Sequence, residues 1–131
     1  MAKILIADDS PTQVATLANC FTGKDHQVEI VGSGLDALEQ TLAESYDLLI
    51  LDLNLPDMSG LDVCTHYKGK GGQGTVMLVT SRDCLNSLEP PVEAFAPDLY
   101  CEKNFKAIEM RVETFLLRLR RKQRIGLTEI K

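Results

Sequence analysis

Short apolar runs alternate five times with segments of helical periodicity along this chain of 131 residues. The predicted strands are KILIAD, QVEIVG, LLIL, TVMLVT and LYCEK, which begin at residues 3, 27, 48, 75 and 99. Such alternation favours a parallel sheet with helices on both faces, joined by right-handed crossovers. The third and fourth runs lack polar alternation, as expected of central strands covered on both faces. The sequence therefore predicts an α/β fold around a five-stranded parallel sheet.

Helices are predicted between the strands and after the last one. The first begins at Pro11, the second follows Ser33, the third runs from about Ser59 to Lys68, and the last begins near Phe105. The first has an apolar face of Val14, Leu17, Ala18 and Phe21, and the second carries Leu35, Leu38 and Leu42. The weak helical region over 84–95 should be short or broken, because Pro90 cannot donate a hydrogen bond and disfavours helical geometry at Glu89.

Ionisable and hydroxyl side chains follow four of the predicted strands. They are Asp8 and Asp9 after the first, Asp52 after the third, Thr80 at the end of the fourth and Lys103 at the end of the fifth. Ligands bind open parallel sheets at the carboxyl ends of the strands, where the strand order switches. Three carboxylates at one edge repel one another and require a cation, and hard oxygen ligands of this kind suit Mg²⁺. The pattern predicts a magnesium site where Asp52 is free to act as a nucleophile toward phosphorus.

Over roughly its first 120 residues the chain resembles the receiver domain of two-component response regulators. The residues that carry the resemblance are Asp8-Asp9, Asp52 within LDLNLPDMSG (close to the family pattern LDxxMPxMDG), Thr80, Tyr100 and Lys103. The resemblance implies a three-layer, doubly wound, flavodoxin-like sheet in the order 2-1-3-4-5, with helices on both faces. It also divides the chain into a receiver domain at 1–122 and a helix end or linker at 123–131.

The resemblance also implies roles for individual residues. Asp52 would accept a phosphoryl group from a histidine kinase or phosphotransfer protein, and Asp8, Asp9, Asp52 and the Asn54 backbone carbonyl would hold Mg²⁺ or Mn²⁺. Thr80 and Lys103 would assist the reaction. Thr80 and Tyr100 would switch the surface formed by the fourth helix, fifth strand and fifth helix, which would contact an output partner or a second copy. Asn54 and Arg82 would tune how long the phosphate persists.

One departure from the family pattern affects the active-site lysine. The family usually has a proline with a cis bond after this lysine, whereas Asn104 follows Lys103 here. A cis bond to a residue other than proline costs about 3–4 kcal/mol, so the alternatives are a trans bond with a shifted loop, which is favoured, and a strained cis bond supported by the fold.

The charge distribution and the cysteines indicate which partners and which cellular compartment to expect. Residues 1–102 hold 5 basic and 16 acidic side chains, a net charge of −11, and residues 103–131 hold 9 basic and 3 acidic, a net charge of +6. The acidic body argues against broad nucleic-acid binding, and no run is long enough to span a membrane. The four cysteines lack the spacing of a metal site. We interpret them as small apolar residues of a protein in the reducing cytoplasm, and not as a disulfide framework. For the basic tail, a solvated helix end, a dimer seam and a linker are alternatives, and direct DNA binding is the least favoured.

Three other functions compete with the phosphoacceptor. The first is a phosphorylation-independent pseudo-receiver that acts as a binding module, for which Asn104 and the broken fourth helix are the only indications. The second is an aspartyl phosphohydrolase, which would need a D-x-D that Asp8-Asp9-Ser10 does not supply. The third is a flavin-binding protein, whose cofactor phosphate Asp8 and Asp9 would repel. The leading expectation is thus a module that catalyses only its own phosphorylation and dephosphorylation.

Overall fold

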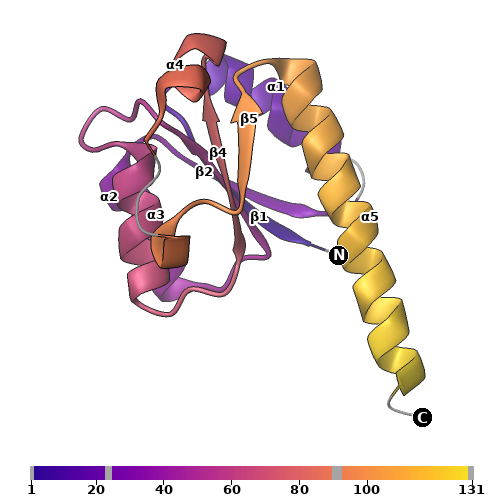
Figure 1. Cartoon of the computed structure of the whole chain (residues 1–131). Helices are drawn as coiled ribbons and strands as arrows, with labels where there is room; N and C mark the ends of the chain where they lie inside the picture. Colours follow the sequence, from indigo (N-terminus) through magenta and orange to yellow (C-terminus); the bar gives the residue numbers. More distant parts are fainter. Residues whose placement is uncertain (1, 23–24, 90–92, 130–131) are drawn as a thin grey trace.

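The computed structural model describes residues 2–22, 25–89 and 93–129, and a five-stranded parallel sheet in the order β2-β1-β3-β4-β5 forms its middle layer (Figure 1). The strands are β1 (Lys3–Ala7), β2 (Gln27–Val31), β3 (Leu48–Asp52), β4 (Thr75–Thr80) and β5 (Leu99–Glu102). The helices are α1 (Pro11–Thr22), α2 (Gly34–Ala43), α3 (Gly60–Gly69), α4 (Arg82–Ser87), the 3₁₀ turn η1 (Glu93–Phe95) and α5 (Phe105–Glu129). The predicted fold class and strand order are confirmed.

Two apolar layers sandwich the sheet. In β1, the side chains of Ile4 and Ile6 join the layer that includes α1 and α5, whereas Leu5 and Ala7 join the layer beneath α2 and α3. Figure 1 shows these two pairs of helices on opposite faces of the sheet. Because both faces are covered, the central strands contain almost no polar positions before their carboxyl ends.

The apolar face predicted for α1 is confirmed, and the three leucines of α2 are buried to different extents. All four residues expected on the inner face of α1 are buried: Val14, Leu17, Ala18 and Phe21. In α2, by contrast, Leu35 is 55% exposed and Leu42 is 69% exposed. Ala37 is fully buried instead and Leu38 is partly buried against the sheet, because the small side chain of Ala37 lets the helix approach closely. Leu35 and Leu42 are seven positions apart and share the outer face.

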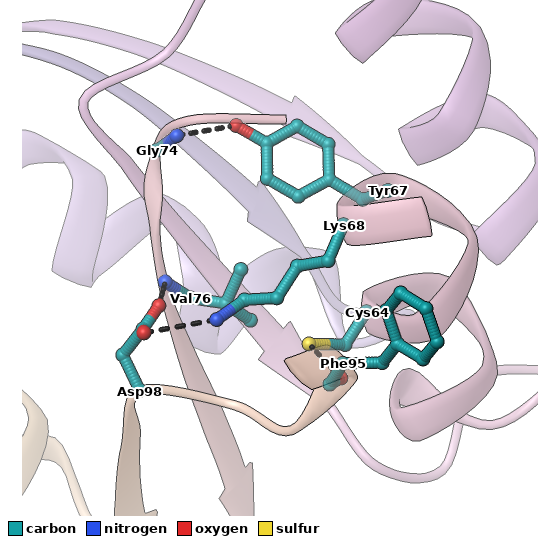
Figure 2. Close-up of polar contacts among 7 residues, drawn as sticks. All are labelled: Cys64, Tyr67, Lys68, Gly74, Val76, Phe95 and Asp98. Atoms are coloured by element: carbon teal, nitrogen blue, oxygen red, sulfur yellow. Dashed lines mark hydrogen bonds and ion pairs between the residues drawn. The ribbon is translucent and has the colours of Figure 1, made fainter. Parts of the chain in front are cut away.

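The interruption after the fourth strand is confirmed. The helix α4 begins two residues earlier than predicted and ends at Ser87, and among the described residues that follow it the next helical turn is η1. Pro90, to which the break was attributed, lies outside the described residues. The turn η1 packs against α3, where the Cys64 thiol donates to the Phe95 carbonyl across 3.3 Å (Figure 2).

Polar contacts hold the amino-terminal ends of β4 and β5 against α3 (Figure 2). The Asp98 carboxylate accepts from the Val76 N–H at 2.8 Å and from Lys68 Nζ at 2.9 Å. The Tyr67 hydroxyl accepts from the Gly74 N–H at 2.7 Å. These bonds satisfy the N–H of Gly74, in the glycine-rich connection, and the N–H of Val76, in β4.

The last helix is the longest element. Ile108 and Val112 are buried against the sheet, and α5 continues past the body of the domain in Figure 1. It also passes Gly126 without a break, although glycine is a weak helix former. Within the described ranges, no helix has both the length and the apolar content needed to cross a bilayer.

Both fully buried cysteines behave as apolar residues. Cys64 and Cys101 lie on opposite sides of the sheet, and burial raises the pKa of the Cys64 thiol to about 11 and also raises that of Cys101. Both are therefore neutral thiols near pH 7. No disulfide links cysteines in the described part of the chain.

Candidate functional site

The residues predicted at the strand ends meet at one edge of the sheet. Asp52 and Thr80 are the last residues of β3 and β4, and Lys103 follows β5 directly. Asp8 follows β1, and its N–H donates to the Val31 carbonyl at the end of β2 across 3.0 Å. The Lys103 N–H likewise donates to the Thr80 carbonyl at 2.7 Å. Main-chain bonds thus place these residues along the carboxyl edge of the sheet, which includes the switch point between β1 and β3.

Asp52 is a buried carboxylate whose two oxygens are both hydrogen-bonded. Its side chain is only 3% exposed. Lys103 Nζ donates to Oδ2 at 2.6 Å, and the Asn54 N–H donates to Oδ1 at 3.1 Å. The ion pair and the backbone N–H offset the cost of removing the carboxylate from water, which explains how the most buried strand can end in an acid.

Three carboxylates converge around this position. Asp8, Asp9 and Asp52 each offer an oxygen within 4.8 Å of the other two. Burial raises the pKa of Asp8, the Ser10 N–H and Lys103 oppose this effect, and the charges of Asp52 and Asp9 add to it. Such a set of hard oxygen ligands, one of them exposed, fits a divalent cation that keeps several waters.

Lys103 provides the positive charge within this acidic cluster. Its Nζ also lies 3.6 Å from Asp8 Oδ2. Partial burial lowers the pKa of Lys103, but the hydrogen bond to Asp52 and the charges of the three acids outweigh that effect, and the pKa is raised overall. The lysine is therefore an ammonium at neutral pH, placed to pair with negative charge next to Asp52.

Thr80 carries an unsatisfied buried hydroxyl. The residue is 1% exposed, and its Oγ1 has no hydrogen-bond partner among the described residues. A buried hydroxyl without a partner is costly, so this one is available to a group that enters the site.

Tyr100 lies in β5 and packs, partly buried, against the apolar layer beneath α2 and α3. Burial raises the pKa of its phenol, which is neutral at physiological pH.

Asn54 follows Asp52 by two residues, and Arg82 follows Thr80 by two residues. The Asn54 side chain is exposed and its backbone joins Ser59 in an isolated antiparallel bridge, which keeps the loop after β3 tight. Arg82, in the first turn of α4, is 75% exposed and its Nη2 lies 3.3 Å from Glu102 Oε2 on β5. The Asn54 N–H bonds to Asp52, whereas the Arg82 contact links α4 to β5.

The bond after Lys103 is trans, as expected, and the lysine still reaches Asp52. Sequence reasoning missed the reason why Asn104 suits this position. Its Oδ1 accepts from the Ala107 N–H at 3.2 Å and its carbonyl accepts from the Ile108 N–H at 2.9 Å, so it caps the first turn of α5. An asparagine immediately before a helical run was the available signal.

The protein-family model described as the response regulator receiver domain matches residues 4–114 of this chain. The chain belongs to that family. The receiver domain is 34% identical over 121 residues to the DNA-binding response regulator MtrA of Mycolicibacterium smegmatis, covering 92% of this chain and 52% of MtrA. It is 29% identical over 108 residues to the response regulator MprA of Mycobacterium tuberculosis, covering 82% of this chain and 46% of MprA. The receiver domain spans about half the length of these curated relatives.

Solved structures are also similar to this receiver domain. The response regulator TrrA of Thermotoga maritima, in complex with Mg²⁺-BeF, superposes with a TM-score of 0.74 at 26% identity, over 88% of this chain and 99% of TrrA. TrrA in complex with the histidine kinase ThkA gives a TM-score of 0.70 at 28% identity, over 88% and 99% of the two chains. Neither the site nor these relatives support the alternative of a phosphorylation-independent binding module.

Proposed function

We propose that this receiver domain accepts a phosphoryl group on Asp52 in a Mg²⁺-dependent reaction. The observation that carries the proposal is the position of the Asp52 carboxylate, within 4.8 Å of oxygens of Asp8 and Asp9 and 2.6 Å from the Lys103 ammonium. The site therefore combines a nucleophile (Asp52), acidic ligands for a metal ion and the positive charge of Lys103. The donor is a sensor histidine kinase or a phosphotransfer protein, in keeping with the kinase complex of TrrA.

In this reaction, an Asp52 carboxylate oxygen attacks the phosphorus atom of the donor. The new O–P bond forms while the bond from phosphorus to the donor nitrogen breaks, and the donor keeps that electron pair and takes up a proton. Lys103 pairs with the negative charge on the transferred oxygens, and the Thr80 hydroxyl donates to one of them after transfer. The reaction modifies the domain itself, so the domain catalyses only its own phosphorylation and dephosphorylation.

The cation, Mg²⁺ or Mn²⁺, would be held directly by Asp9, Asp52 and the Asn54 backbone carbonyl. Asp8 would hold it through water. The unsatisfied Thr80 hydroxyl and the mutual repulsion of the three acids support this fit. When bound, the cation neutralises the charge that develops on the phosphoryl oxygens. The bond from the Asn54 N–H to Asp52, and the place of Arg82 two residues after Thr80, support a role for both in the lifetime of the phosphate.

For output, Thr80 and Tyr100 would move together and change the surface formed by α4, β5 and α5. On this surface, apolar and basic side chains of β5 and α5 line a hollow of about 430 Å³: Leu99, Ala107, Met110, Arg111, Phe115 and Arg118. A downstream protein or domain, or a second copy of this chain, would dock there. Residues 1–122 would form the receiver domain and 123–131 the helix end or a linker. The module would act in the cytoplasm without binding DNA itself.

The test is incubation of the purified protein with acetyl phosphate, with and without Mg²⁺, followed by intact-mass spectrometry. We expect a gain of one phosphoryl group that requires Mg²⁺ and is absent in Asp52→Asn. Asp36→Asn, which neutralises an exposed acid of α2, is the matched control and should be labelled normally. A gain that persists in Asp52→Asn or in excess chelator would overturn the assignment of the phosphoacceptor or of the metal.

A further inference from the structure

The amino terminus of α2 is capped by a residue from a different part of the chain. Ser33, the local N-cap, accepts from the Asp36 N–H with its side chain and from the Ala37 N–H with its carbonyl. The N–H groups of Gly34 and Leu35 donate instead to the two carboxylate oxygens of Asp57, at 2.8 and 2.9 Å. All the free N–H groups of the first turn are thereby satisfied, two of them by a residue more than twenty positions away.

Asp57 lies at the tip of the loop that follows β3, and this loop carries Asn54. The base of the loop is held by the Leu53 N–H, which donates to the Val79 carbonyl, and by the Gly60 N–H, which donates to the Leu53 carbonyl, both at 2.9 Å. The Asp57 contact with α2 is the corresponding attachment at the tip. The two hydrogen bonds are charge-assisted, because the Asp57 carboxyl is ionised at neutral pH and the Gly34 and Leu35 N–H groups lower its pKa further.

Packing supports the same contact. A Cβ on Gly34 would lie 2.3 Å from the Met58 Cγ, so the absence of a side chain at Gly34 is what lets Met58 close over the start of α2. Met58 packs, partly buried, in the layer beneath α2 and α3. Two successive loop residues, one charged and one apolar, therefore dock on one helix terminus.

We propose that Asp57 is a positioning residue for the metal site, which holds the loop bearing Asn54 against the start of α2 and so fixes the Asn54 carbonyl relative to Asp52. The inference rests on the proposed function, because it assigns a purpose to the loop geometry only if a cation binds there. Without Asp57, the base of the loop keeps its main-chain bonds while its tip loses both anchors to the Gly34 and Leu35 N–H groups. The Asn54 carbonyl then samples a wider range of positions, and the affinity for the cation falls.

The test compares Mg²⁺ binding by wild type and Asp57→Ala, measured by calorimetric titration, and the Mg²⁺ dependence of labelling by acetyl phosphate. For Asp57→Ala we expect a rise of about tenfold in the Mg²⁺ concentration at half-saturation, as when a metal site loses an outer supporting contact. Labelling should approach the wild-type rate at saturating Mg²⁺, since Asp52 and Lys103 are untouched. Asp57→Asn, which keeps one acceptor oxygen and loses the charge, should lie between the two and substitutes for Asp57→Ala if that variant does not fold.

A matched control separates positioning from simple destabilisation of α2. Asp36→Ala removes an acidic side chain from the first turn of the same helix but leaves the loop contact in place. It should lower the melting temperature without changing the Mg²⁺ dependence. If wild type binds Mg²⁺ and Asp57→Ala binds it equally well, the inference is wrong while the proposed function stands. If wild type itself binds no Mg²⁺, the proposed function and the inference fall together.

Discussion

Lys103 Nζ lies 2.6 Å from Asp52 Oδ2, although 51 residues separate the two along the chain. The carboxylate is 3% exposed and the lysine side chain is 33% exposed, so the pair lies at the boundary between the sheet and solvent. The contact has two consequences. It stabilises a buried negative charge in the absence of metal, and it places a cation next to the atom that we propose accepts the phosphoryl group.

Removal of the Lys103 charge should destabilise the metal-free domain. In Lys103→Met, Asp52 remains buried with no ionic partner, and we expect the free energy of unfolding in chelator to fall by about 1–3 kcal/mol, because solvent already screens the partly exposed lysine. Urea denaturation measures this. Saturating Mg²⁺ should reduce the deficit, because a bound cation compensates the same charge. Lys106→Met, which removes an exposed positive charge from the first turn of α5, should have little effect in either buffer, and an equal loss in both variants would contradict the explanation.

Neutralising Asp8 should have the opposite effect on stability. Burial and the charges of Asp52 and Asp9 raise the pKa of Asp8, so its ionised form is less favourable in the folded than in the unfolded chain. At pH 7 in chelator, Asp8→Asn should increase the free energy of unfolding by an amount on the order of 1 kcal/mol. The same variant should gain less stability from Mg²⁺ than wild type does. An unchanged or lowered stability in chelator would mean that repulsion within the acidic cluster is already compensated.

Stability should fall at alkaline pH partly because of Tyr46. Burial, followed by the charges of Glu44 and Glu29, raises the pKa of this phenol from 10.0 to about 12. The unfolded chain therefore loses the proton first, and the contribution of Tyr46 is present below pH 10 and lost as the pH rises toward 12. The loss should amount to about 1–3 kcal/mol. Denaturation of wild type and Tyr46→Phe between pH 9 and 12 measures it, and parallel curves for the two proteins would rule it out.

Replacing Gly72, in the glycine-rich connection to β4, by alanine should destabilise the protein far more than replacing Gly32 does. A Cβ on Gly72 would lie 2.4 Å from the Tyr67 ring, which is held by the hydrogen bond to the Gly74 N–H. Gly72→Ala should therefore lower the free energy of unfolding by about 1–3 kcal/mol through overpacking. Gly32→Ala, where a Cβ meets nothing within 4 Å, is the control and should change it by less than about 0.5 kcal/mol. Equal effects would show that the ring moves aside.

Much of the site was predictable because each of its residues follows a strand that has its own local signature. Asp8, Asp52, Thr80 and Lys103 come at the carboxyl ends of apolar runs, and the parallel arrangement brings those ends to a single edge. The burial of α1 was predictable for a similar reason, since four apolar residues share one face of its helical repeat. In α2 the leucines do not show which face is inward, because Leu35 and Leu42 lie on the outer face and Ala37 is buried.

The sequence by itself determined the alternation of strands and helices, the break in the fourth helix and the acids at the strand ends, because these depend on the periodicity and chemistry of neighbouring residues. The tertiary structure alone decided three other features: the face that α2 turns inward, the cap that Asn104 forms on α5, and the contact of Asp57 with Gly34 and Leu35. These depend on how closely separate elements approach and on which backbone groups then lack a partner. Such properties belong to the packed molecule and not to any short stretch of its chain.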